Sequence, residues 1–208
     1  MGMAGQTQPA DNRTAFNQTE YFNGTQTVNR QLEQAMADLT ELIQQAEEGT
    51  PSATLLEELL NRMYDLFRGI IPYNRIGFSL IEPDGQTVRA VWARSDRPLK
   101  LSTGYTSGLK GSSLEFIVQS GYPRIINDLE AYLQRKPRSE ATRLLVAEGM
   151  RSSLTCPLIA SGKPVGFLFF TSIYPKTYSI YHIKIFKQIA HQLSQILDRG
   201  RFLSQVGA

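Results

Sequence analysis

Apolar residues recur at helical spacing in three stretches of this chain, two near its N-terminus and one near its C-terminus. Between residues 25 and 48 they alternate steps of three and four, at Val28, Leu32, Ala35, Leu39, Leu42 and Ala46. A second stripe begins after Pro51 and is ended by Pro72. The third stripe lies within Ser179–Leu197, at Ile183, Phe186, Ala190, Leu193 and Leu197. Such spacing places side chains on one face of an α-helix, so we expect three helices, of which the first and third have coiled-coil periodicity.

Period-two alternation predicts two β-hairpins between the second and third helices. The first pairs strands over 75–82 and 87–94, and the second pairs strands over 151–159 and 164–173. Between the hairpins, Ser112 and Glu115 form a capping box that begins a short helix. A short strand over 123–126 and a helix over 139–148 follow, whereas residues 95–111 carry few helix or strand signals. This order predicts an α+β domain with a largely antiparallel sheet.

Composition and rare residue types restrict the chemistry. Apolar residues make up 41% and charged residues 20% of the 208 residues, which is ordinary for a folded domain. The single cysteine, Cys156, excludes an internal disulfide, a four-cysteine zinc site and a two-cysteine redox centre. The histidines, His182 and His191, lie nine residues apart on one expected helix and therefore on roughly opposite sides of it. We expect no metal and no cofactor.

The charge distribution and the lack of long apolar runs bear on location and partners. The net charge of +3 combines an acidic N-terminal quarter with a basic remainder. The basic residues are scattered, and no helix-turn-helix or aromatic RNA-binding strand stands out, so we expect no nucleic-acid binding. No apolar run approaches the length of a membrane span, and no signal-peptide core is present. We therefore expect a cytoplasmic protein without membrane insertion.

Several motifs in this order resemble the GAF domain, a small-molecule sensor module of bacterial signalling proteins. The most specific is Glu148-Gly149-Met150-Arg151-Ser152-Ser153-Leu154, which continues through Pro157-Leu158 and Gly162 to Val165-Gly166-Phe167-Leu168. Asp84-Gly85 in the first hairpin and Ile125-Ile126-Asn127-Asp128 in the middle section also fit. The resemblance covers residues 50–200. It implies about six antiparallel strands, with terminal helices on one face and a ligand pocket under loops and short helices on the other.

The resemblance also implies a homodimer, because such domains usually pair through their flanking helices. The helix over 25–48 could instead pack on its own domain, but two coiled-coil stripes suit a four-helix bundle of two chains. We therefore favour a dimer interface that contains Val28, Leu32, Leu39, Leu42, Ile183, Phe186, Leu193 and Leu197. Residues 1–24 are expected to form a disordered tail and residues 201–208 a second tail.

Known activities of the family fit this chain unevenly. Free methionine sulfoxide reductases depend on several cysteines, and a lone Cys156 cannot form their resolving disulfide. Bilin-binding members attach the pigment to a cysteine in the middle section, haem-binding members need a pocket histidine, and the cyclic-nucleotide signature is missing. We expect no catalysis.

Eight polar or aromatic residues are candidates for ligand contact. Alternation predicts that Trp92 and Arg94 share a face with Val88 and Ala90, where an indole beside a guanidinium suits an aromatic or anionic ligand. The full candidate set is Trp92, Arg94, Ser112, Ser113, Asp128, Arg143, Ser153 and Thr155. We expect a sensor that binds a small anionic or aromatic molecule and signals to a downstream protein or output domain. The alternative is a ligand-free dimerisation module with a vestigial pocket.

Overall fold

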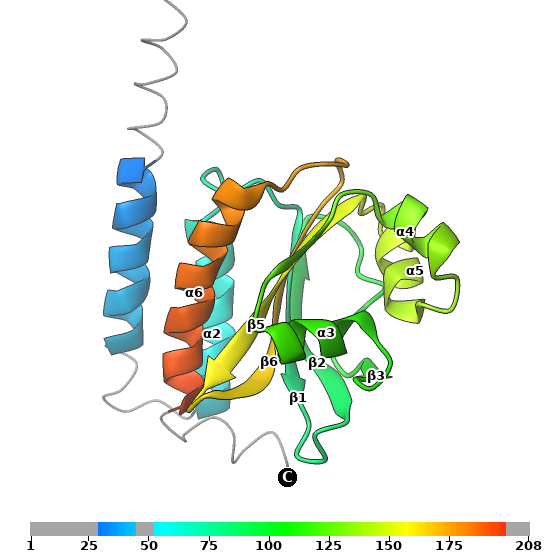
Figure 1. Cartoon of the computed structure of the whole chain (residues 1–208). Helices are drawn as coiled ribbons and strands as arrows, with labels where there is room; N and C mark the ends of the chain where they lie inside the picture. The colour runs from blue at the N-terminus through cyan, green and yellow to red at the C-terminus, as the bar shows by residue number, and fades with distance from the viewer. Residues whose placement is uncertain (1–28, 45–51, 199–208) are drawn as a thin grey trace, which may run out of the picture.

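A six-stranded antiparallel sheet forms the centre of the computed structural model, which describes residues 29–44 and 52–198 (Figure 1). The strands lie in the order β3-β2-β1-β6-β5-β4. Their bounds are β1 Arg75–Ile81, β2 Thr87–Ser95, β3 Thr106–Gly108, β4 Arg124–Ile126, β5 Ser152–Ala160 and β6 Lys163–Ser172. The two expected hairpins meet where β1 pairs with β6, so the α+β prediction with about six antiparallel strands is confirmed.

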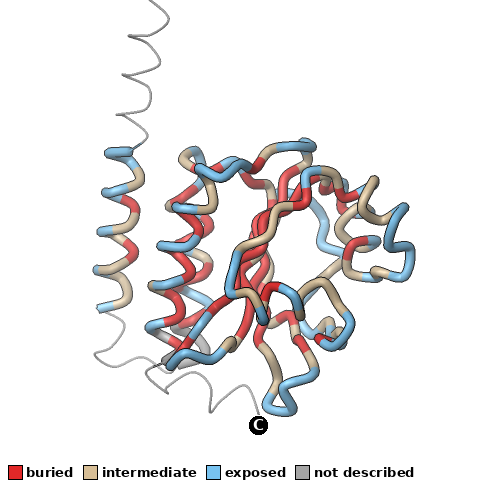
Figure 2. Tube along the Cα trace, in the orientation of Figure 1, coloured by how far each residue is buried: buried red, intermediate tan, exposed pale blue. Residues whose placement is uncertain are grey.

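Helices cover both faces of the sheet (Figure 1). A helix over residues 29–44, α2 (Ser52–Leu66) and α6 (Ile180–Asp198) lie on one side, which we call the helix face. The shorter helices α3 (Ser113–Ser120), α4 (Leu129–Arg135) and α5 (Glu140–Ala147) lie on the opposite side, the cavity face. Figure 2 shows the central strands buried along most of their length, as expected for a sheet covered twice.

Two elements differ from the sequence prediction. The helix α2 ends at Leu66, well before Pro72, and an isolated bridge between Arg68 and Ile71 follows it. The stretch over 95–111 contains β3, whose three residues pair with Thr87–Arg89 of β2. Three residues are too few to show alternation, so this edge strand left no signal in the sequence.

The sheet register divides the side chains between the two faces. Directly paired residues of antiparallel strands point to the same face, and Ile76 pairs with Phe170 while Phe78 pairs with Leu168. These four side chains join α2 and α6 in the main hydrophobic core. The Phe170 ring lies 3.9 Å from the Phe186 ring of α6, centroid to centroid. The alternate residues therefore point to the cavity face.

A β-bulge in β2 overturns the expected common face of Val88, Ala90, Trp92 and Arg94. Ser79 pairs with Ala90, but its neighbour Phe78 pairs with Trp92, so β2 contains one extra residue, Val91. One inserted residue reverses the alternation beyond it. Val88 and Ala90 accordingly face the cavity, whereas Trp92 and Arg94 face the helices.

The helix over 29–44 packs against α6 of the same chain. Gln192 Nε2 donates a hydrogen bond to Thr40 Oγ1 at 3.0 Å, and Tyr181 Oη donates one to Asn29 Oδ1 at 3.1 Å. Leu39 is completely buried within the single chain. This is the alternative packing that the sequence left open.

The residues proposed for the dimer interface are therefore divided. Leu39, Phe186, Leu193 and Leu197 are buried within one chain, so none can contact a second copy unless the helices separate. Leu32, Leu42 and Ile183 remain partly accessible. Val28 and the two expected tails, 1–24 and 201–208, lie outside the described residues.

Candidate ligand-binding site

A cavity lies between the sheet and the helices α3, α4 and α5. It encloses about 780 Å³ of space not filled by atoms, part of it open to solvent. Its apolar wall includes Val88, Ala90, Leu101, Leu114, Ile126, Leu129, Leu145 and Phe169. Its polar wall includes Arg75, Ser79, Tyr105, Ser107, Ser113, Arg124, Ser139, Thr142, Ser153, Thr155 and Thr171. Concave apolar walls with a few polar groups are typical of small-molecule sites.

Four hydroxyl side chains form the floor of the cavity. Ser79 comes from β1, Ser153 and Thr155 from β5, and Thr171 from β6, and the register places all four on the cavity face. All four residues are buried. Thr171 Oγ1 has no hydrogen-bond partner within the described part of the chain. Since buried polar atoms are normally hydrogen-bonded, this floor offers donors and acceptors to a guest molecule.

An ion pair anchors the loop that closes one side of the cavity. Arg75 Nε lies 3.0 Å from Glu148 Oε2, and both side chains are almost completely buried. Glu148 Oε1 accepts hydrogen bonds from the backbone N–H groups of Lys100 and Leu101, each at 2.7 Å. Burial lowers the pKa of Arg75, and the attraction of Glu148 opposes that shift. The pair thus connects β1 and the end of α5 to the loop after β2.

Gly77 makes room for this ion pair. A Cβ atom at Gly77 would lie 2.6 Å from Arg75 Nη1, so a side chain there would have to displace the guanidinium. The sequence prediction missed Arg75 and used Glu148 only as part of a family motif. A basic residue at the start of an otherwise apolar strand was the available signal, because a buried charge needs a partner.

Arg124, Tyr132 and Ser113 lie together at the rim of the cavity. The Arg124 guanidinium lies 5.5 Å from the centroid of the Tyr132 ring. Burial raises the pKa of Tyr132, but hydrogen bonding to Ser113 and the charge of Arg124 outweigh it, so the pKa is lower than usual. Arg124 Nε is itself buried without a hydrogen-bond acceptor among the described residues. Arg124 therefore brings a positive charge without an ion-pair partner among the described residues to the rim.

The structure brings four of the eight candidate residues to the cavity. Ser113, Ser153 and Thr155 line it from the cavity face. Trp92 also contributes to the wall, although its strand register and core contacts place it on the helix face. Trp92 therefore borders both the cavity and the helix-side core.

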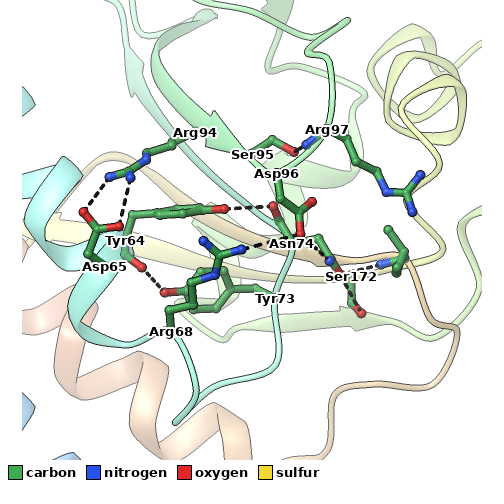
Figure 3. Close-up of polar contacts among 11 residues, drawn as sticks. Tyr64, Asp65, Arg68, Tyr73, Asn74, Arg94, Ser95, Asp96, Arg97 and Ser172 are labelled. Carbon is green, nitrogen blue, oxygen red and sulfur yellow. Dashed lines mark hydrogen bonds and ion pairs between the residues drawn. The ribbon is translucent and has the colours of Figure 1, made fainter.

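Arg94 lies outside the cavity because the bulge turns it toward α2. Its Nη2 atom pairs with Asp65 Oδ1 at 2.8 Å, and its guanidinium lies 4.5 Å from the centroid of the Tyr64 ring (Figure 3). The same close-up shows Asn74 between Tyr64 and Asp96, with Nδ2 donating to Asp96 Oδ2 at 2.8 Å. Arg94 is thus part of a polar network that fastens α2 to the sheet.

The other three candidates perform local structural roles. Ser112 is the N-cap of α3 and accepts a hydrogen bond from the Leu114 N–H. Asp128 is the N-cap of α4, and its carboxylate also lies 3.6 Å from Arg151 Nη2. Arg143 is exposed and donates to the Pro137 carbonyl oxygen at 2.9 Å. None of the three lines the cavity, because short-range capping or loop contacts already use their polar groups.

Other chemistry finds little support in the described residues. Over 29–44 and 52–198, no cluster of three or more histidine, cysteine or acidic residues could hold a metal ion. Cys156 faces the helices, and burial raises the pKa of its thiol to about 12. In the same ranges, no helix has the length and apolar character needed to cross a bilayer.

Comparisons with known proteins agree with this architecture. The phycoerythrobilin-bound GAF domain of a cyanobacterial phytochrome superposes with a TM-score of 0.62 at 17% identity, covering 81% of this chain and 95% of that one. The GAF domain of a two-component sensor histidine kinase from Bacillus halodurans superposes with a TM-score of 0.60 at 17% identity, covering 72% of this chain and 98% of that one. Free methionine-R-sulfoxide reductase from Neisseria meningitidis superposes with a TM-score of 0.55 at 15% identity, covering 81% of this chain and 89% of that one. These identities establish a shared fold only.

Sequence comparison identifies the family. No match is found among curated protein sequences. The family model described as GAF domain, however, matches residues 53–198, which include every strand, the helices α3 to α6 and all but the first residue of α2. The expectation drawn from the sequence motifs is thereby confirmed, and the chain belongs to the GAF domain family.

Proposed function

We propose that this chain is a non-enzymatic signalling sensor that binds a small polar molecule in the cavity between the sheet and α3–α5. The observation that carries the proposal is the hydroxyl floor formed by Ser79, Ser153, Thr155 and Thr171. A cavity that served only as core would be filled with apolar side chains, because buried polar groups without partners are destabilising. A guest that supplies hydrogen bonds would remove that cost.

The absence of catalysis is part of the proposal and rests on the chemistry of the wall. The cavity wall contains no histidine, cysteine or carboxylate among its described residues. The one thiol, Cys156, faces the other side of the sheet and stays protonated near neutral pH. The polar groups of the wall can therefore bind and orient a guest, but they include no conventional nucleophile–base pair.

We also propose that occupancy is relayed through the helices of a homodimer. The polar network around Tyr64, Asn74 and Arg94 links α2 to the strands that border the cavity. Partly accessible Leu32, Leu42 and Ile183 offer an apolar surface on the outer helices. A molecule that shifts β2 would act on α2 through these contacts and then on a second copy.

Native mass spectrometry of the gently purified protein tests binding and subunit number together. We expect a dimer that retains a small molecule, and a stabilising hit from a metabolite panel in thermal unfolding. Thr155→Ile, which fills the floor with an apolar branch, should abolish the hit, while Thr103→Val in an exposed loop should leave it intact. A dimer with no retained molecule and no stabilising hit would favour the alternative, a pairing module whose cavity is unused.

A further inference from the structure

An open groove continues the cavity toward solvent. It runs between β3 and the turn that joins α4 to α5, and it contains about 1450 Å³ of non-atom space, including open solvent. Six residues line both hollows: Tyr105, Ser107, Ser113, Leu114, Ser139 and Ala141. We call this hollow the outer groove. It gives a molecule in solution a direct path to the cavity.

The outer groove is basic. Arg135, Lys136 and Arg138 line it and are exposed, while Glu140 is its only acidic lining residue among those described. None of the three basic residues has an ion-pair partner in the described part of the chain. Clustered charge of one sign along a concave wall raises the local concentration of oppositely charged solutes. The groove thus favours the entry of anions.

Arg124 lines the cavity beside Tyr132, which lines the outer groove, and no ion pair neutralises its charge within the described residues. The other arginine of the cavity wall, Arg75, is paired with Glu148. Arg124 instead contacts the Tyr132 ring, and no carboxylate among the described residues pairs with it. A half-buried guanidinium without a counter-ion is a strong binder of carboxylate and phosphate groups.

The inner part of the cavity is built for a different kind of group. Its floor carries hydroxyls but no free charge, and its walls are largely apolar. Thr171 Oγ1 is completely buried and unpartnered within the described residues. A neutral hydroxyl or carbonyl would satisfy such atoms, whereas a second charge placed there would lose its hydration without gaining a counter-ion.

We infer that the molecule sensed is a small organic acid of two parts, an inference that rests on the proposed function. Its carboxylate or phosphate group is held at the rim by Arg124. Its uncharged end, which bears hydroxyl or carbonyl groups, lies on the floor of the cavity. Arg135, Lys136 and Arg138 accelerate its entry without contacting it in the final complex.

The test uses pairs of probes that differ only in the acidic group. Glucose 6-phosphate and glucose, glycerol 3-phosphate and glycerol, and lactate and lactamide are titrated into the full chain, with inorganic phosphate and acetate as fragments. We expect the acidic member of each pair to bind and its neutral counterpart not to bind. Comparison of the phosphate pairs with the carboxylate pair shows which anion is preferred. Arg124→Gln should weaken acid binding about 10- to 100-fold, as loss of a charge-assisted contact requires, and Arg124→Lys should restore part of it.

Two matched variants separate the roles of the arginines. Arg143→Gln, which removes an exposed arginine outside both hollows, should leave acid affinity unchanged. The double variant Lys136→Gln/Arg138→Gln should slow association at low salt, and high salt should abolish the difference from wild type. Circular dichroism of each variant verifies that the fold is intact.

The outcomes separate the two proposals. Equal binding of an acid and its neutral counterpart, or unchanged acid binding in Arg124→Gln, would overturn the inference but leave a sensor of neutral molecules. If no probe binds and native mass spectrometry finds no retained molecule, the proposed function fails, and the inference fails with it.

Discussion

Arg75 and Glu148 form a buried ion pair, with 3.0 Å between Arg75 Nε and Glu148 Oε2, although 73 positions separate them in the chain. The Glu148 carboxylate also holds the backbone of Lys100 and Leu101, and Arg75 Nη2 donates to the Leu101 carbonyl oxygen at 2.8 Å. One pair of charges thus orders a strand, a helix end and a loop around the cavity.

Removing one partner of this pair should destabilise the protein strongly. Glu148→Ala leaves the Arg75 guanidinium buried without a counter-charge, and we expect a loss of about 3–5 kcal/mol in the free energy of unfolding. Urea denaturation followed by the fluorescence of the single tryptophan measures this loss. The double variant Arg75→Met/Glu148→Leu should recover much of the stability. A single variant as stable as wild type would contradict the buried pair.

Two glycines of the sheet, one central and one at its edge, should differ in their tolerance of alanine. A Cβ at Gly166 would lie 2.2 Å from the Ser79 carbonyl oxygen, which belongs to the backbone and cannot move aside. We expect Gly166→Ala to lower the free energy of unfolding by at least about 1–3 kcal/mol, the loss typical of an overpacked core. Gly108→Ala on the edge strand β3, where no atom lies within 4 Å, is the control. Equal stability of the two variants would contradict the described sheet spacing.

His182 should make the protein less stable in mild acid. Burial lowers the pKa of His182 from its ordinary value of 6.5, so the unfolded chain takes up the proton first. The neutral His182 ring therefore contributes to folding stability above pH 6.5, and this contribution is lost as the pH falls toward the lower pKa of the folded state. His182→Asn, in which the amide oxygen can still accept from the Ser179 N–H, should flatten this dependence. Unfolding free energies of the wild type and of His182→Asn at pH 7.5 and 5.5 measure this dependence. Equal losses of stability in the two proteins on acidification would show that His182 is not its source.

Leu39 tests whether the helix over 29–44 packs on its own chain. Leu39→Ala removes a completely buried side chain, and we expect the docking of this helix to weaken by about 2–5 kcal/mol. Amide hydrogen exchange over residues 29–44 should accelerate, while light scattering should report an unchanged subunit number. Ala37→Ser on the exposed side of the same helix is the control. Dissociation of a dimer without faster exchange would show that Leu39 contacts a second copy instead.

Arg94 should be dispensable for binding. Its ion pair with Asp65 lies at the surface, with 36% and 60% of the two side chains exposed, so Arg94→Ala should cost no more than about 1 kcal/mol. Any acid that stabilises the wild type should stabilise this variant by the same shift in melting temperature. A lost shift would mean that Arg94 reaches the ligand and that the bulge in β2 is misplaced.

Local patterns in the sequence determined most of the secondary structure. The heptad spacing, the two hairpins and the cap at Ser112 depend on neighbours within a few residues, so they could be predicted without knowing the fold. The family motifs then indicated the arrangement of layers. Ser153 and Thr155, two of the candidate residues, lie on the face opposite Leu154 because β5 alternates without interruption there.

Only the tertiary structure decided which polar residues meet at the cavity. One extra residue at Val91 reverses the alternation of β2, so Arg94 faces α2, and no short-range pattern announces such an insertion. The partner of Arg75, Glu148, is likewise set by a segment distant in sequence. Periodicity records which face of an element is buried, whereas a binding site depends on which faces are brought together, and long-range packing alone determines that.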